Sequence, residues 1–223
     1  MIQHGDIVTQ PLFLLFIAVT AMLSIGYFWG RRVNRRLFLS AFNGLADIIG
    51  PDDQTFTNIG GLVGYHANFL IKRQSPIAKI DATITLLPRH SLLYLPISML
   101  IMRHDRLFVS IHLKSSLQGE AHLIETKYAA FRGPKISNAE RLTREKVRWG
   151  PYDFYLYYEL AAMRDKLNAF MRTHPDPGVV RHVAMVPGQR KCFVFMIPRQ
   201  DAVKADFHAV YRWLQTVCAG NAV

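Results

Sequence analysis

Histidine and cysteine are the residues of this sequence best suited to metal binding or nucleophilic chemistry, but their spacing is unfavourable. No two of His104, His112 and His122 have the spacing of an HExxH motif. Cys192 and Cys218 form no CxxC pair for zinc and stand in apolar strings, which is typical of packing thiols in a reducing compartment. We therefore expect no metal or cofactor site and no catalytic residue.

Two short motifs resemble parts of nucleotide-dependent enzymes without completing them. Arg103-His104-Asp105 resembles a fragment of a kinase catalytic loop, but the downstream Asn and the other kinase elements are missing. The stretch from Gly60 to Gly64 is not GxGxxG and lacks a βαβ setting, so it does not predict dinucleotide binding. The sequence thus favours a non-enzymatic protein.

The basic residues are more informative than these motifs. Lys and Arg outnumber Asp and Glu 27 to 16, which gives the 223-residue chain a formal net charge of +11. Such a balance indicates anionic partners: nucleic acid, ribosomes or phospholipid headgroups. Basic residues are dense between Lys127 and Arg148, where only Glu140 and Glu145 oppose them. The candidate contacts with an anionic partner are Lys135, Arg141, Arg144, Lys146 and Arg148.

A helix is expected to present part of this cluster. Ser137 and Glu140 have the spacing of a capping box, so a short helix should begin at Ser137 and place Arg141, Arg144 and Arg148 on one face. Guanidinium groups suit bidentate contacts with phosphate, which favours RNA or lipid headgroups as the partner. The alternative is a solvated helix with a weak Glu140–Arg144 pair.

The start of the chain predicts a membrane anchor over residues 1–30. From Val8 to Gly30, 23 residues pass without an Asp, Glu, Lys, Arg or His. At about 1.5 Å per residue this run is long enough for a hydrocarbon core of about 30 Å. A cleaved signal peptide is the alternative, but it needs a basic start and a small-residue cleavage site, and this sequence has neither.

The charges around this run predict its orientation. No Lys or Arg precedes it, whereas four arginines follow at once. By the positive-inside rule the N-terminus should lie outside or in the lumen, and the C-terminal body in the cytosol. The arginines that determine this topology are Arg31, Arg32, Arg35 and Arg36.

Residues 31–223 predict a single cytosolic α+β domain with a mainly antiparallel sheet and several helices. Apolar and polar residues alternate over 78–87 and 106–114, so these segments should be neighbouring antiparallel strands with one wet face. Residues 65–73 and 121–128 are also strand-like, and 179–186 with 191–198 has the pattern of a hairpin. Residues 152–158 are aromatic and ambiguous.

The helices of this domain follow from apolar residues spaced three and four apart. Residues 31–49 should continue the anchor as a helix that ends at Gly50. A second apolar stripe begins at Leu160 and ends near Pro175. The last helix follows Asp201, a candidate N-cap, and runs from about Val203 to Val217.

The segment Ser91–Met102 has no charged residue and carries Pro96 in its middle. It is too short to span a bilayer, so we expect a buried core helix kinked by the proline. The alternative is a surface that meets lipid or the apolar flank of a membrane protein. The candidate apolar contacts on that alternative are Leu93, Ile97 and Leu100.

Several short motifs in order along the chain carry a family resemblance. They are Gly30-Arg31-Arg32-Val33-Asn34 at the end of the anchor, Phe69-Leu70-Ile71-Lys72-Arg73-Gln74, Met102-Arg103 with Asp105 before a strand, Gly133-Pro134-Lys135-Ile136, and Lys191-Cys192-Phe193-Val194-Phe195-Met196-Ile197-Pro198 before the last helix. In this order the chain resembles the calumin family, the coiled-coil-domain-containing subunit of the PAT complex in the multipass translocon. The likeness is that of a short form, without the family's acidic N-terminal segment and C-terminal coiled coil.

The resemblance implies a non-enzymatic factor that assists insertion or assembly of multipass membrane proteins near the translocon. The partners it implies are membrane lipid, the translocon channel, other membrane-insertion subunits and ribosomal RNA. The alternative is a membrane-tethered enzyme or binding domain that uses a basic groove for an anionic lipid or metabolite. An enzyme of that kind would need a pocket with convergent polar groups.

Overall fold

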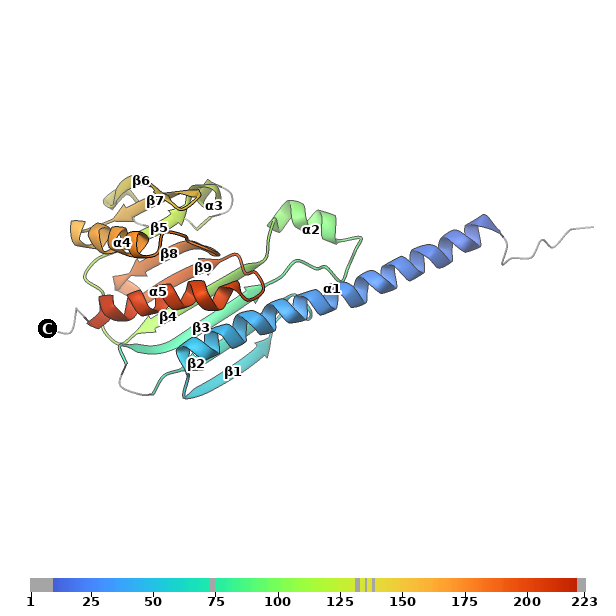
Figure 1. The fold of residues 1–223 in the computed structure, drawn as a ribbon, viewed down its shortest axis with the longest axis horizontal. Helices are drawn as coiled ribbons and strands as arrows, with labels where there is room; N and C mark the ends of the chain where they lie inside the picture. Colours follow the sequence, from blue (N-terminus) through green and yellow to red (C-terminus); the bar gives the residue numbers. More distant parts are fainter. Residues whose placement is uncertain (1–9, 73–74, 131–132, 135, 138, 220–223) are drawn as a thin grey trace, which may run out of the picture.

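A long helix leads into a layered α+β domain in the computed structural model, which describes residues 10–72, 75–130, 133–134, 136–137 and 139–219 (Figure 1). Helix α1 (Pro11–Ile49) is 39 residues long and unbroken, so the apolar run and the helix expected after it are one element. It is long and apolar enough to cross a membrane. It ends at Gly50, whose φ of 53° is a left-handed conformation that glycine adopts without steric cost.

The two halves of α1 differ in their surroundings. Nearly all side chains before Gly30 are exposed, whereas Leu37, Ala41, Leu45 and Ile49 are buried in the domain. This spacing of four places them on one stripe, which packs against the sheet and against α5 (Ala202–Ala219). The expected helix over residues 31–49 is confirmed.

The described strands form one nine-stranded sheet in the order β1-β2-β3-β4-β9-β8-β5-β7-β6, and each pairing is antiparallel. The predicted α+β class with a mainly antiparallel sheet is therefore confirmed. The bounds of the strands are β1 Asp53–Asn58, β2 Gly64–Leu70, β3 Ile77–Thr85, β4 Arg106–Leu113, β5 Ala121–Glu125, β6 Thr143–Trp149, β7 Tyr152–Tyr158, β8 Val180–Val186 and β9 Lys191–Met196.

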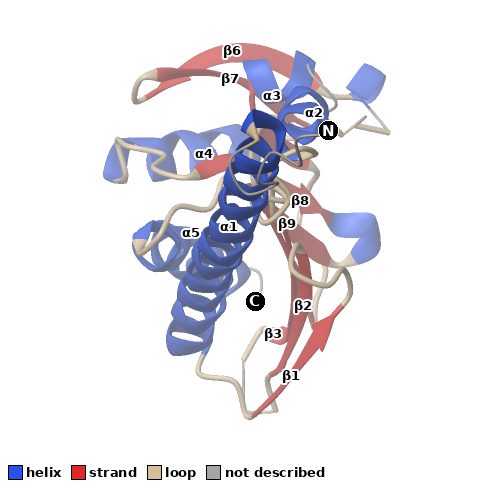
Figure 2. Cartoon of the chain, turned by 90° about the vertical axis from the view of Figure 1, so that its right-hand side faces the viewer, coloured by secondary structure: helices blue, strands red, loops and turns tan. Residues whose placement is uncertain are grey.

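One face of the sheet carries the main core. Ile80, Ala82 and Ile84 of β3 are buried, and the intervening residues are partly exposed, which is the predicted alternation. Helices α4 (Ala161–Thr173) and α5 cover this face together with α1, and Figure 2 shows α4 and α5 on one side of the curved sheet. The predicted hairpin is β8 and β9, joined by the 3₁₀ turn η3 (Pro187–Gln189).

In the region from β5 to β6, two predicted elements differ from the structure. The strand expected over 121–128 ends at Glu125 and gives way to the short helix α3 (Thr126–Ala130). The helix expected from Ser137 is only a 3₁₀ turn, η2 (Ala139–Arg141), and is followed by strand β6. The physical reason is the pairing of β6 with β7, which buries Trp149 against Phe154 and Phe170 of the core.

Candidate functional site

Helix α2 (Leu95–Met102) is an exposed apolar helix, so the expectation of a buried, kinked core helix was wrong. Leu93 is 75% exposed, Ile97 52% and Leu100 79%, and only Ser98 of the helix is buried. Pro96 lies in the first turn, where its missing N–H leaves no hydrogen bond unmade, and therefore it introduces no kink. Figure 1 shows α2 at the end of the sheet from which the apolar half of α1 projects.

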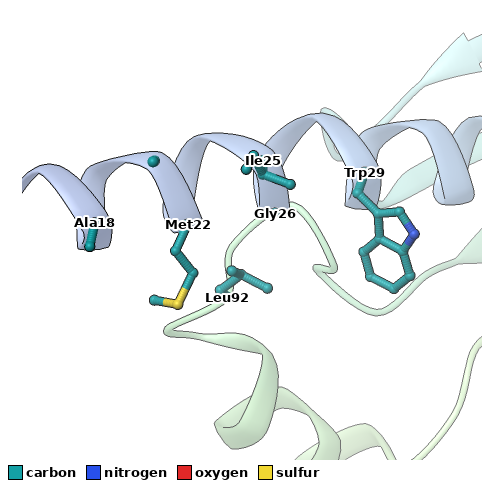
Figure 3. Close-up of a pocket in the computed structure, with 7 residues that line it drawn as sticks. Ala18, Met22, Ile25, Gly26, Trp29 and Leu92 are labelled. Atoms are coloured by element: carbon teal, nitrogen blue, oxygen red, sulfur yellow. The ribbon is translucent and has the colours of Figure 1, made fainter.

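The loop before α2 lies directly against α1 because two glycines permit it. A Cβ atom at Gly30 would overlap the backbone of Arg89 and His90, and one at Gly26 would overlap the side chain of Leu92. Figure 3 shows Leu92 beside Gly26, at the edge of a cavity of about 530 Å³ along α1. Its other lining residues are Ala18, Ala21, Met22, Ile25 and Trp29.

A buried polar network fixes the same loop to α1. The side-chain amide of Asn34, 1% exposed, donates hydrogen bonds to the carbonyls of Leu62 (3.2 Å) and Leu87 (2.9 Å). Its oxygen accepts one from Arg89 (2.9 Å), whose guanidinium also forms a bidentate pair with Asp105 at 2.9 and 2.6 Å. Because these polar groups satisfy one another, the network holds the loop before α2 at a defined place beside α1.

The four topology arginines follow this contact along α1. Arg31, Arg32, Arg35 and Arg36 are all exposed, whereas Asn34 between them faces the domain. Leu92 packs against Gly26, which lies five residues, roughly 7.5 Å, before Arg31 on the apolar side of the arginines. The segment that leads into α2 thus reaches the level of the apolar run.

The second candidate surface is the basic edge strand β6. Arg144, Lys146 and Arg148 alternate with Glu145 and Val147, so they share one face of the strand and all three are exposed. Lys146 pairs with Asp153 of β7 at 3.0 Å, and the Arg144 guanidinium lies 5.2 Å from the centre of the Tyr155 ring. Arg141 is exposed in η2, outside the strand, and Lys135 lies outside the described residues.

The residues first considered for metal or catalytic chemistry lie apart. His112 of β4 pairs with Asp81 of β3 at 2.7 Å, and His122 of β5 contacts Glu120 at 2.9 Å. In the described part of the chain, no group of three or more His, Cys, Asp or Glu side chains is placed to hold a metal ion. Cys192 and Cys218 are free and buried, and burial raises the pKa of both thiols.

Sequence reasoning missed the contacts that place α2. The spacing of Gly26 and Gly30, four residues apart in an apolar helix, is a signal for close approach of another segment and was available in the sequence. The Asn34–Arg89–Asp105 network had no such signal, because its members come from three separate elements. No protein-family model matches the chain, and no curated protein matches it in a sequence comparison.

Proposed function

We propose that this protein is a single-pass, membrane-anchored, non-enzymatic factor that assists insertion or assembly of multipass membrane proteins. The observation that carries the proposal is helix α2, which is apolar, exposed and held beside a helix able to span a membrane. The likeness to the calumin family supports the same role. The proposed partners are membrane lipid, the translocon channel with other insertion subunits, and ribosomal RNA.

The composition of α2 supports contact with lipid or with a membrane protein. A helix that is apolar on all sides is normally buried, either in a protein core or in a membrane. Around α2, Leu93, Tyr94, Met99, Leu100 and Ile101 are all exposed. Covering a leucine of this kind contributes about 1.5–3 kcal/mol, so the surface favours an apolar environment strongly.

The anchor supports the orientation proposed for the molecule. With the arginines that follow Gly30 on the cytosolic side, the sheet lies in the cytosol and the N-terminus outside or in the lumen. Leu92 then lies at the cytosolic boundary of the membrane, and α2 begins three residues later. The domain would therefore present α2 where newly inserted segments leave a channel.

The cavity of about 530 Å³ along α1, an open groove, supports a transmembrane segment as the client. Apolar helices pack closely in a membrane where small residues allow their backbones to approach. Ala18 and Ala21 line the groove together with Met22 and Ile25, and it carries almost no polar surface. A client helix can contact this groove and α2 together, because Leu92 borders the first and leads into the second.

Site-specific crosslinking tests this proposal. A photoreactive residue at Leu93, Ile97 or Leu100 of the full chain should crosslink to nascent multipass membrane proteins during synthesis, since these side chains are exposed at the proposed client surface. Leu100→Gln should lower the yield of inserted multipass proteins and leave single-pass and soluble proteins unchanged. The melting temperature in detergent should stay within about 2 °C, because substitutions at exposed sites change stability little.

The matched control is Leu160, which is 45% exposed at the opposite end of the sheet, where β7 ends. A photoreactive residue there should not capture nascent membrane proteins, and Leu160→Gln should not change their insertion. If photoreactive residues around α2 capture only lipid, or if positions 100 and 160 capture clients equally, α2 is a membrane contact and not a client site.

A further inference from the structure

A basic cavity of about 310 Å³ lies at the end of the sheet nearest the anchor, directly after α2. Arg103 reaches it from the end of α2, Arg106 from the start of β4, Lys127 from α3, and Arg181 from β8. Among the described residues that line it, Glu125 is the only carboxylate. The cavity is separate from the basic face of β6, and none of its four basic residues belongs to that cluster.

The wall of the cavity is a buried ion pair. Arg181 and Glu125 are 5% and 9% exposed, and their closest nitrogen and oxygen atoms lie 3.3 Å apart. Arg181 also donates hydrogen bonds to the carbonyls of Gly178 and Val180, at 2.8 and 2.7 Å, and its guanidinium stacks 4.1 Å from the centre of the Tyr152 ring. Glu125 is thus already neutralised by Arg181, and the lining keeps a surplus of positive charge.

Two nitrogen atoms in the lining are buried and have no hydrogen-bond partner among the described residues. They are Nε of Arg106 and Nε2 of His104. An unsatisfied buried donor is unfavourable, and an anionic oxygen in the cavity would satisfy it. Burial lowers the pKa of His104, and the positive charge of Arg106 lowers it further, so the ring is neutral at neutral pH and can offer one N–H.

We propose that this cavity binds a phosphate group, carried by a phospholipid headgroup or by a soluble phosphorylated compound. Arg106 and Lys127 are the principal contacts, His104 contributes a hydrogen bond, and the Arg181–Glu125 pair positions the wall. Guanidinium and ammonium groups converging from three elements suit the tetrahedral oxygens of phosphate. A volume of about 310 Å³ has room for a phosphate-bearing headgroup.

The position of the cavity connects it to the membrane. Arg103 follows the last residue of α2, so an apolar surface and a phosphate site lie next to each other in the sequence and in space. A lipid whose chains contact α2 would place its headgroup phosphate at this point. Binding of a lipid phosphate would fix the depth of the domain at the membrane surface without any role in client recognition.

Titration of the full chain in neutral detergent with inorganic phosphate or glycerol 3-phosphate gives one arm of the test. The other compares its thermal unfolding in nanodiscs of phosphatidylcholine alone and with added phosphatidic acid. Binding in the first arm identifies a soluble phosphate compound as a sufficient ligand. A higher melting temperature with phosphatidic acid, without binding in the first arm, identifies the lipid headgroup.

Arg106→Gln should weaken binding in the responsive arm by about tenfold or more, because it removes a charge-assisted contact. Arg212→Gln, an equal loss of charge at an exposed position of α5 outside both basic surfaces, should change it less than about twofold. Lys127→Gln, at an exposed position of α3, should weaken binding even if Arg106→Gln fails to fold.

No response in either arm would overturn the proposal, as would an equal loss with Arg212→Gln. Neither measurement includes client insertion, so a failure of the phosphate-binding proposal is distinguishable from a failure of the proposed function.

Discussion

At the scale of single residues, the least expected feature is a pair of histidines packed face to face on the side of the sheet opposite the main core. The rings of His122 and His182 stack with centres 5.7 Å apart, and Tyr128 of α3 lies over His182 and Phe195. Neither ring nitrogen of His182 has a hydrogen-bond partner among the described residues. Burial and, to a smaller extent, the nearby His122 lower the pKa of His182 to about 3.

This burial predicts a loss of stability in mild acid. Because the pKa of His182 is near 6.5 in the unfolded chain and about 3 in the folded protein, only the unfolded chain takes up a proton between these values. Stability from this group is full above about pH 6.5 and falls as the pH drops toward 3. Between pH 7 and pH 5 the loss should be roughly 2 kcal/mol, measured as the free energy of unfolding in denaturant.

His182→Phe is the informative variant, since the ring site is apolar and the native nitrogens make no hydrogen bond there. It should flatten the pH dependence by most of that amount while keeping or raising stability at pH 7. His208→Phe, at an exposed position of α5, should leave the slope unchanged. Equal slopes in the wild type and His182→Phe would show that His182 is not held neutral in the folded protein.

At the scale of elements, the charges of strand β6 have two competing explanations. As an edge strand it needs charged side chains to prevent pairing with other chains. As a surface for ribosomal RNA or anionic lipid it needs the same residues to release counterions on binding. Its geometry also changes which residues act together, because Arg141 lies outside the strand and Lys146 shares the face with Arg144 and Arg148.

Replacing Arg144, Lys146 and Arg148 together by Gln separates these explanations. If β6 contacts RNA, co-sedimentation with membrane-stripped ribosomes should fall, and the salt slope should decrease by up to about three. Folding should persist, because the described ion pair of this face, Lys146–Asp153, is exposed and contributes little. Unchanged binding together with new self-association would identify the charges as edge protection.

Periodicity predicted the elements whose one face is buried and whose other face is wet. The alternation in β3 and β4 and the apolar stripe of α5 appear in the structure where they were expected. Sequence reasoning failed for β6, because the Ser137–Glu140 pair resembles a helix start. Tertiary pairing with β7 makes the segment after it a strand. Asp201 was expected as a helix cap, and its carboxylate accepts a hydrogen bond from Ser40 of α1.

The candidate surfaces were harder to predict than the fold. An uncharged segment such as Ser91–Met102 has the same composition whether it packs in a core or meets a membrane, so its exposure is visible only in three dimensions. The basic cavity draws on positions from 103 to 181, and no linear pattern joins them. The four arginines of residues 31–36, by contrast, are recognisable in the sequence because they directly follow the apolar run, and all four are exposed on α1.

At the scale of the whole molecule, the unbroken α1 couples the domain to the apolar run that is able to span a membrane. The same helix contributes the apolar run before Gly30 and the buried stripe that ends at Ile49, and no linker separates the two. The loop before α2 and the polar network around Asn34 add a second connection at the same end. The orientation of α1 therefore decides which compartment contains the sheet, α2 and the basic cavity.

Cysteine labelling tests that orientation. Gln3→Cys should react with a membrane-impermeant maleimide added outside intact cells or inside sealed vesicles, and Asp53→Cys, exposed in β1, should react only after permeabilisation. Background should be low, because Cys192 and Cys218 are buried and burial raises the pKa of the Cys218 thiol to about 11. Replacing Arg31, Arg32, Arg35 and Arg36 by Gln should weaken the preference for this orientation over the reverse one. Labelling of Asp53→Cys but not Gln3→Cys would place the sheet outside and exclude cytosolic partners.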